Sequence, residues 1–319
     1  MVLQVLLLVV GFVLLIKGAD WLVSGASALG KKFNISDLAI GLTIVAFGTS
    51  APELVVNAIA AFENKPELIF GNVIGSNNIN LFVILGLTGL ITPLAVKSST
   101  AWREIPLSFG AIVVLFLLAN NLFLYGSPWL SRLDGLVLML MFVLFLFYVY
   151  RQLKSDIIQA EDGVKELTNL KIVFFVLIGI AGLVGGGKMV MNSAVAIAQN
   201  LGVSEKIIGL TIVALGTSLP ELSTSVVAAL KKNVDIAVGN IIGSNIFNIF
   251  LILSVSSLIR PITYNQSFNT DLYLLAGGTL FLYLAMFTGG RKKLDRWEAA
   301  LLLIAYLVYT WLLIRQEIH

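Results

Sequence analysis

Two short segments of this chain place carboxylates and hydroxyls inside otherwise apolar sequence. Residues 46–55 read AFGTSAPELV, and residues 214–223 read ALGTSLPELS. Each segment presents a threonine, a serine, a proline and a glutamate in the same order. Carboxylate, hydroxyl and carbonyl oxygens are the ligands that hard cations such as Ca²⁺ take in sets of about six to eight. The two segments therefore indicate a cation site.

The spacing within the first segment supports this interpretation. Thr49 and Glu53 are four residues apart, and Ser50 and Glu53 are three apart, so a helix presents all three on neighbouring positions of one face. Pro52 removes one backbone hydrogen bond and disturbs the turn before it. The carbonyl of Gly48 is then free to face protein, water or a ligand. The second segment repeats this spacing, with its proline likewise expected in the middle of a helix.

A second motif follows each segment and supplies more oxygen atoms. Residues 71–80 read GNVIGSNNIN, and residues 239–248 read GNIIGSNIFN. In each copy a serine and an asparagine lie four residues apart, on one helical face. Asn72 and Asn77, with their counterparts Asn240 and Asn245, are expected to have packing or supporting roles. The candidate side-chain ligands of both motifs are Glu53, Glu221, Thr49, Thr217, Ser50, Ser218, Ser76, Ser244, Asn80 and Asn248.

Each candidate also has a purely structural interpretation. A buried glutamate can be protonated or hydrogen-bonded, serine and threonine often bond to the backbone of their own helix, and asparagine can join neighbouring helices. A carboxylate at the centre of a bilayer costs at least about 2.5 kcal/mol. Two glutamates at equivalent positions with the same hydroxyl neighbours favour the site over the structural interpretation.

The amino-acid composition indicates that these motifs lie in a membrane protein. Of 319 residues, 58% are hydrophobic and 12% are charged, about half the charged fraction of a soluble domain. Several apolar runs reach the roughly 20 residues needed to cross a bilayer. The chain has no cysteine, and its one histidine is His319, which excludes disulfides, thiolate metal sites and a buried Ser–His pair. We expect an all-α polytopic membrane protein with the lipid bilayer as its partner, without cofactor or nucleic acid; the oligomeric state stays unknown.

The chain divides into ten apolar spans arranged as two copies of five. The expected spans are 2–29, 38–62, 69–92, 105–125, 133–150, 171–197, 206–230, 237–259, 270–289 and 297–315. Residues 41–62 and 209–230 are identical at 14 of 22 positions, with an offset of 168 residues that also aligns the second motif. We therefore predict a first five-helix repeat (1–150, motifs 41–80), a linker (151–171) and a second repeat (172–319, motifs 209–248). Because five is odd, the second repeat must be inverted in the membrane, which is typical of secondary transporters.

Basic residues predict the orientation of the chain. With the N-terminus outside, inside segments hold 14 lysines and arginines and outside segments hold five, in agreement with the positive-inside rule. Both termini are then extracellular and the 151–171 linker cytoplasmic, in the plasma membrane of a prokaryote. The N-terminal run lacks a charged region and a cleavage site, so we interpret it as the first span and not as a signal peptide.

The pair of motifs resembles a known family. GTSAPE and GTSLPE, each followed by GNxIGSN, are similar to the repeat motifs of the cation/Ca²⁺ antiporter superfamily and resemble most its prokaryotic Na⁺/Ca²⁺ exchanger branch. The resemblance implies that Glu53 and Glu221 bind Ca²⁺ and Na⁺, that the hydroxyls complete the Na⁺ sites, and that the carbonyls of Ala46 and Ala214 are ligands. It also implies that the first and sixth spans lie across the other eight and slide.

One departure from the family concerns the second motif. K⁺-dependent members carry an aspartate at one of the positions that match Asn80 and Asn248, and this chain has asparagine at both. This argues against K⁺ co-transport. Members that exchange H⁺ for Ca²⁺ carry an additional acidic residue in the GN motif, which is absent here.

Four functions remain to be compared. The first is an antiporter that exchanges Ca²⁺ for Na⁺ by alternating access, and the second is a Ca²⁺/H⁺ antiporter. A cation channel is disfavoured, because the repeat is intramolecular and inverted. An intramembrane enzyme would need a Ser/His pair, an aspartate pair or an HExxH motif, and the sequence contains none.

Overall fold

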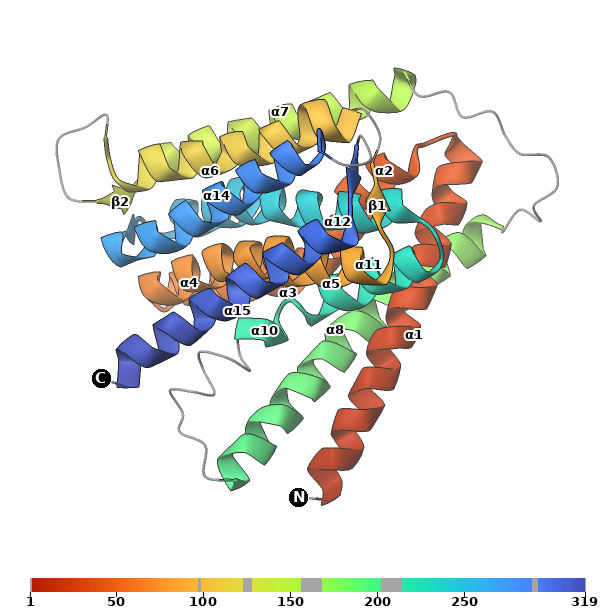
Figure 1. The fold of residues 1–319 in the computed structure, drawn as a ribbon, viewed down its shortest axis with the longest axis horizontal. Coiled ribbons are helices and arrows are strands. Elements are labelled where there is room, and N and C mark those ends of the chain that lie inside the picture. Colours follow the sequence, from red (N-terminus) through yellow and green to blue (C-terminus); the bar gives the residue numbers. More distant parts are fainter. Residues whose placement is uncertain are drawn as a thin grey trace.

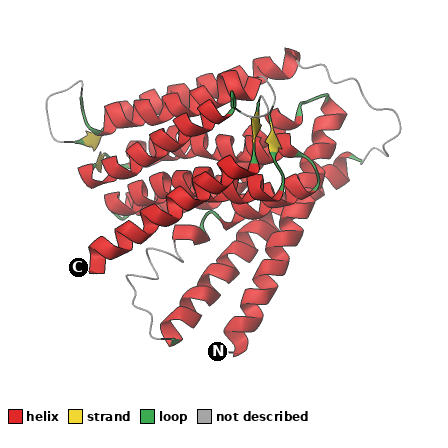
Figure 2. Cartoon of the chain, viewed as in Figure 1, coloured by secondary structure: helices red, strands yellow, loops and turns green. Residues whose placement is uncertain are grey.

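The computed structural model describes residues 2–96, 99–122, 128–155, 168–201, 214–288 and 292–318. These residues are almost entirely helical (Figures 1 and 2), as expected where lipid offers no partner to backbone polar groups. Among the described residues, eight helical runs are long and apolar enough to cross a membrane. Two shorter helices, Leu219–Leu230 and Asn269–Ala285, fall on the predicted seventh and ninth spans.

The first repeat contributes the following elements in chain order: α1 (Val2–Phe33), α2 (Asp37–Ile40), η1 (Gly41–Val45), α3 (Ala46–Phe62), α4 (Pro66–Asn78), η2 (Ile79–Ile84), α5 (Leu85–Ile91), β1 (Leu94–Ala95), η3 (Thr100–Glu104), α6 (Ile105–Ala119), β2 (Trp129–Leu130) and α7 (Arg132–Ser155).

The second repeat continues with α8 (Asn169–Asn200), α10 (Ala214–Gly216), α11 (Leu219–Leu230), α12 (Val234–Phe247), η5 (Asn248–Ile252), α13 (Leu253–Ile259), β3 (Ile262–Thr263), η6 (Gln266–Phe268), α14 (Asn269–Ala285), β4 (Lys293–Leu294) and α15 (Arg296–Ile318). Residues 206–213, the first part of the predicted span 206–230, lie outside the described residues, as do residues 156–167 of the predicted linker 151–171.

Helices α1 and α8 form a closely packed pair, set at a steep angle to the other helices (Figure 1). A Cβ added at Gly18 would lie 2.9 Å from the carbonyl oxygen of Gly179, and one added at Gly11 would lie 3.0 Å from that of Gly186. The small residues thus let the two backbones touch. Low numbers on α1 meet high numbers on α8, so the helices are antiparallel. The 168-residue offset relates Gly18 to Gly186 and Gly11 to Gly179, so it converts one of these contacts into the other. This is expected for two inverted repeats.

The connections gather at two ends of the molecule. At one end β1 pairs with β4, and at the other β2 pairs with β3 (Figure 1). We call the first end, which carries residues 31–37, 94–96, 231–235 and 292–295, the basic end. The opposite end carries residues 63–67, 120–122, 128–132 and 260–269. This grouping agrees with the alternation of the ten predicted spans, and the fold is the predicted all-α membrane protein of ten transmembrane helices in two inverted repeats.

Helix α12 and the start of η5 occupy the centre of the bundle. Residues 236–250 are buried without exception, as expected for a helix surrounded by other helices. Wide π-helical turns interrupt the regular helix at equivalent places of the repeats, in η2 and η5. Such turns often occur at functional sites; here they include Asn80 and Asn248. These turns were not predicted from the amino-acid sequence.

The two prolines differ in their position. Pro52 lies inside the continuous helix α3, as predicted. The prediction for Pro220 is wrong, because the helix stops after Gly216 and α11 begins at Leu219, which places Pro220 in its first turn. Proline is well tolerated there, since the first turn of a helix has backbone N–H groups without helical partners.

Candidate cation site

Glycines bring the motif helices of the two repeats into contact. A Cβ at Gly41 of η1 would lie 3.1 Å from the Cα of Gly239 of α12. A Cβ at Gly243 would lie 2.8 Å from the Cβ of Ala46. The backbones can approach this closely only because both α12 positions lack a side chain. The contact places segment 46–55 of the first repeat against motif 239–248 of the second.

Glu53 of α3 and Glu221 of α11 are the carboxylates of the site. Each is 1% exposed. Ser50 donates a hydrogen bond to Oε1 of Glu221 at 3.1 Å. Both oxygens of Glu53 and Oε2 of Glu221 accept none from the described residues. The ion pairs found among these residues include neither glutamate.

Thr49 connects its own helix to the second repeat. Its hydroxyl donates to Oδ1 of Asn240 at 3.0 Å, lies 3.2 Å from the carbonyl oxygen of Ala46, and lies 3.4 Å from the hydroxyl of Ser244. All four residues are buried. This cluster holds three of the predicted oxygen ligands next to one another and rigidly fixes the Thr49 side chain.

The corresponding cluster around Thr217 is less complete. Thr217 and Ser76 each donate to Oδ1 of Asn72 at 3.3 Å. The Thr217–Asn72 bond is the repeat counterpart of Thr49–Asn240. Ser218, the counterpart of Ser50, is buried, and its hydroxyl has no hydrogen-bond partner among the described residues.

Four asparagines form a hydrogen-bonded group between α4–η2 and α12–η5. Asn80 donates its amide to Oδ1 of Asn245 at 3.0 Å, and Asn248 donates to Oδ1 of Asn77 at 2.9 Å. Asn77 also donates to the backbone oxygen of Asn245 at 3.2 Å. Since both amides are occupied, the Oδ1 atoms of Asn80 and Asn248 remain, buried and without a donor among the described residues.

The candidate ligands thus include buried oxygens that the described residues leave without a hydrogen-bond partner. There are six: Glu53 Oε1, Glu53 Oε2, Glu221 Oε2, Asn80 Oδ1, Asn248 Oδ1 and Ser218 Oγ. Leaving a buried acceptor unsatisfied costs about 1–3 kcal/mol, and more when it is charged. Carboxylate, amide and hydroxyl oxygens of this kind are the ligands that a hard cation takes. The described residues hold no cluster of three or more His, Cys, Asp or Glu, so a metal here would bind two carboxylates and neutral oxygens.

Hydrogen bonds among the described residues connect most of the predicted ligands in separate groups, whereas the side chains of Glu53 and Ser218 have no such bond. Ala46 contributes its carbonyl to the Thr49 cluster, and Ala214 begins α10, three residues before Thr217. Asn72 and Asn240 have the supporting role expected of them, because each accepts a hydrogen bond from a candidate threonine of the other repeat.

The architecture and this centre define a class of protein. Two inverted helical repeats with a buried, oxygen-rich centre between them are the arrangement of secondary transporters. The chain belongs to the family described as Sodium/calcium exchanger protein, which it matches over residues 3–151 and 171–315.

Relatives and solved structures agree with this membership. The chain is 39% identical to inner membrane protein YrbG of Escherichia coli strain K12 over 270 residues, covering 82% of this chain and 81% of YrbG. It is 30% identical to sodium/calcium exchanger MaX1 of Methanosarcina acetivorans over 342 residues, covering 95% and 96%. The solved structure of the sodium-calcium exchanger NCX_Mj superposes with a TM-score of 0.81 at 32% identity, covering 96% of this chain and 97% of that one.

Proposed function

We propose that this protein exchanges Ca²⁺ for Na⁺ across the membrane of a prokaryotic cell by alternating access. The observation that carries the proposal is the set of buried oxygens around Glu53 and Glu221, placed where the two repeats meet. The transported ions, and no cofactor, occupy that centre. MaX1 and NCX_Mj, which carry the exchanger name, support the choice of ions.

The proposed ligands are the residues predicted from the motifs. They are Glu53, Glu221, Thr49, Thr217, Ser50, Ser218, Ser76, Ser244, Asn80 and Asn248, with the carbonyls of Ala46 and Ala214. The unpartnered atoms in this set, and the hydrogen bonds that fix Thr49, Ser50, Asn80 and Asn248, support it.

The proposed division and orientation follow the charge distribution. The repeats comprise 1–150 and 172–319, joined by a cytoplasmic linker over 151–171. The basic end is cytoplasmic and both termini are extracellular, in the plasma membrane. The grouping of Lys31, Lys231 and Lys232 around one pocket at the basic end supports this orientation.

The two carboxylates also explain why transport would be coupled. Without a cation, moving the site through an occluded state would bury two unpaired charges at a cost of several kcal/mol each. One Ca²⁺, or two or more Na⁺ assisted by neutral oxygens, neutralises them. Only loaded states therefore cross. Fast Ca²⁺ efflux from proteoliposomes without an external counter-ion would contradict this coupling.

The test is ⁴⁵Ca²⁺ uptake into proteoliposomes loaded with Na⁺, compared with K⁺-loaded and acid-loaded vesicles. Uptake should require internal Na⁺; uptake driven by internal acid would instead indicate a Ca²⁺/H⁺ antiporter. Glu53→Gln and Glu221→Gln should each reduce uptake by more than about 100-fold. With one carboxylate removed, one of the two positive charges of a buried Ca²⁺ is left without a negative partner. The exposed Glu67 offers a matched control, and Glu67→Gln should transport like the wild type.

A further inference from the structure

Four charged residues occupy equivalent positions in the two repeats with their signs exchanged. The 168-residue offset relates Asp20 of α1 to Lys188 of α8, and Glu63 after α3 to Lys231 after α11. The backbone supports the second equivalence, because Glu63 and Lys231 share a φ of −79° as helix caps. The residues after them also share an unusual positive φ, 58° and 61°.

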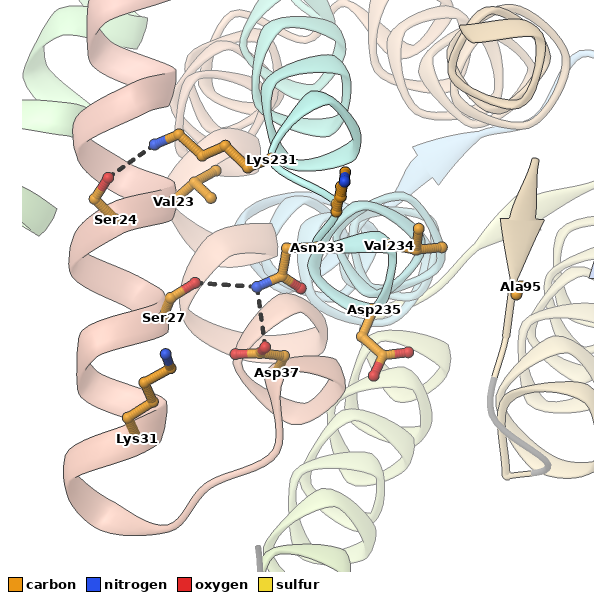
Figure 3. Close-up of a pocket in the computed structure, with 11 residues that line it drawn as sticks. Val23, Ser24, Ser27, Lys31, Asp37, Ala95, Lys231, Asn233, Val234 and Asp235 are labelled. Carbon is orange, nitrogen blue, oxygen red and sulfur yellow. Dashed lines mark hydrogen bonds between the residues drawn. The ribbon is translucent and has the colours of Figure 1, made fainter. Parts of the chain in front are cut away.

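At the basic end the acidic and basic partners are joined. Lys231 Nζ lies 2.6 Å from Oδ1 of Asp20, 3.0 Å from its carbonyl oxygen and 2.8 Å from the hydroxyl of Ser24. Two residues later, Asn233 donates to Ser27 of α1 at 3.1 Å. Figure 3 shows Lys231 bonded to Ser24 and Asn233 bonded to Ser27 along the wall of a pocket of about 630 Å³. Helix α1 is thus fastened to the end of α11.

At the opposite end the equivalent partners are apart. Glu63 pairs with its neighbour Lys65 at 2.5 Å, with both side chains more than half exposed. Lys188 is exposed, and among the described residues no ion pair includes it. The ends therefore differ in whether the equivalent charges meet.

The side chains next to these charges also differ between the repeats: those on α1 accept hydrogen bonds, and their counterparts on α8 donate them. Asp20 and Ser24, four residues apart on α1, offer oxygens to an ammonium group. Their counterparts Lys188 and Asn192, four residues apart on α8, offer N–H donors that suit a carboxylate such as that of Glu63. Both sets share one helical face.

We propose that these residues form two alternating latches, Asp20–Lys231 at the basic end and Lys188–Glu63 at the opposite end. In this conformation the first latch is closed and the second open. When the site opens to the other side of the membrane, the inverted repeats exchange conformations, the first latch opens, and Glu63 leaves Lys65 to pair with Lys188 and Asn192. This inference rests on the proposed alternating access. Because exposed ion pairs are weak, each latch shifts the balance of the two states only a few-fold.

The test measures distances between spin labels at two repeat-equivalent pairs of exposed positions. Phe33 and Leu230 report the basic end, and Leu201 and Phe62 report the opposite end. The chain has no cysteine, so a label attaches only at the introduced cysteines. In the opposite conformation the basic-end distance should be longer and the opposite-end distance shorter. Lys231→Ala should increase the fraction of molecules in that conformation a few-fold over the wild type.

Glu63→Ala should act in the other direction and enrich the present conformation. Lys232→Ala, which removes the neighbouring lysine, is the control and should leave both distributions unchanged. The exchange Asp20→Lys with Lys231→Asp should restore the wild-type distribution. Shifts of the same sign in Lys231→Ala and Glu63→Ala, or no shift, would overturn the latches. Since distances are measured without transport, that result would leave Na⁺-dependent ⁴⁵Ca²⁺ uptake as a separate test of the proposed function.

Discussion

The site helix of the first repeat runs through Pro52 without interruption, whereas that of the second repeat stops at Gly216 and resumes at Leu219. The hydrogen bonds differ in the same way: Ser50 reaches Glu221, while its counterpart Ser218 has no partner among the described residues. The two halves carry nearly the same motif but adopt different conformations. Packing, and not the motif itself, therefore determines the conformation of each half.

The α8 helix offers one physical reason for this difference. A Cβ at Gly48 would lie 2.9 Å from Cδ1 of Ile180, and a Cβ at Gly216 would lie 2.7 Å from Cγ of Met191. These contacts are not related by the 168-residue offset, so α8 presses on the two site helices at non-equivalent points. A transporter built from inverted repeats needs such asymmetry, because two identical halves would open the site equally to both sides.

The largest effect that would test the comparison concerns the glycines of the second motif. Gly243→Ala should destabilise the protein by about 1–3 kcal/mol, because the new Cβ meets Ala46 and the backbone of Leu42 at less than 3 Å. Gly75→Ala, the same change in the first repeat, meets no described atom within 4 Å and should stabilise the helix by up to about 1 kcal/mol. Thermal unfolding in detergent measures both. Equal losses in the two variants would mean that the halves are packed alike.

The asparagine group should respond symmetrically, in contrast to the glycines. Asn80→Asp and Asn248→Asp each replace an amide donor by a carboxylate that faces the Oδ1 of another asparagine. Each should cost about 1–3 kcal/mol without Ca²⁺, and the two losses should be similar. Bound Ca²⁺ should restore more stability than in the wild type, because a third carboxylate faces the cation.

Thermal unfolding with and without Ca²⁺ checks this prediction, and Asn64→Asp, a surface change outside the group, serves as the control. A loss confined to one of the two variants would show that the asymmetry of the repeats extends into the asparagine group.

The sequence was sufficient to predict an all-α membrane protein of ten transmembrane helices in two inverted repeats, because this fold follows from the lengths of the apolar runs and from the repeat offset. It did not predict the break before Pro220 or the π-helical turns. The motif GTSxPE is the same in both halves, so no local signal distinguishes a continuous helix from a broken one. The contacts that distinguish them come from α8, far away in the sequence.

The hydrogen-bonded asparagines illustrate the same limit within the site. Helical spacing separated Asn77 from the Ser76–Asn80 face, which suggested a packing or supporting role without specifying its partner. The structure shows that a residue off this face can still fix a candidate ligand from the other repeat, as Asn77 does for Asn248. Contacts between repeats depend on how the helices cross, which spacing along one helix does not specify.

The smallest expected effect distinguishes the two threonines. Thr49 is fully buried with three oxygen neighbours, whereas Thr217 is partly buried and donates a hydrogen bond to Asn72. Thr49→Val should weaken Ca²⁺ binding about tenfold, equivalent to one hydrogen bond of about 1–1.5 kcal/mol, and Thr217→Val only a few-fold. Equilibrium ⁴⁵Ca²⁺ binding to the purified protein measures both.

Thr49→Val and Thr217→Val can also show whether their different effects on Ca²⁺ binding arise from the conformation of the protein or from the residues around each threonine. In the Lys231→Ala background, which should enrich the opposite state, the two repeats exchange surroundings, and Thr217→Val should become more costly relative to Thr49→Val. If Thr49→Val keeps the same excess in both backgrounds, the difference between the halves is fixed in the residues around each threonine. If the difference in lost Ca²⁺ affinity between the two variants becomes smaller or reverses, each threonine binds the cation tightly only when its own repeat adopts the conformation that the first repeat has here.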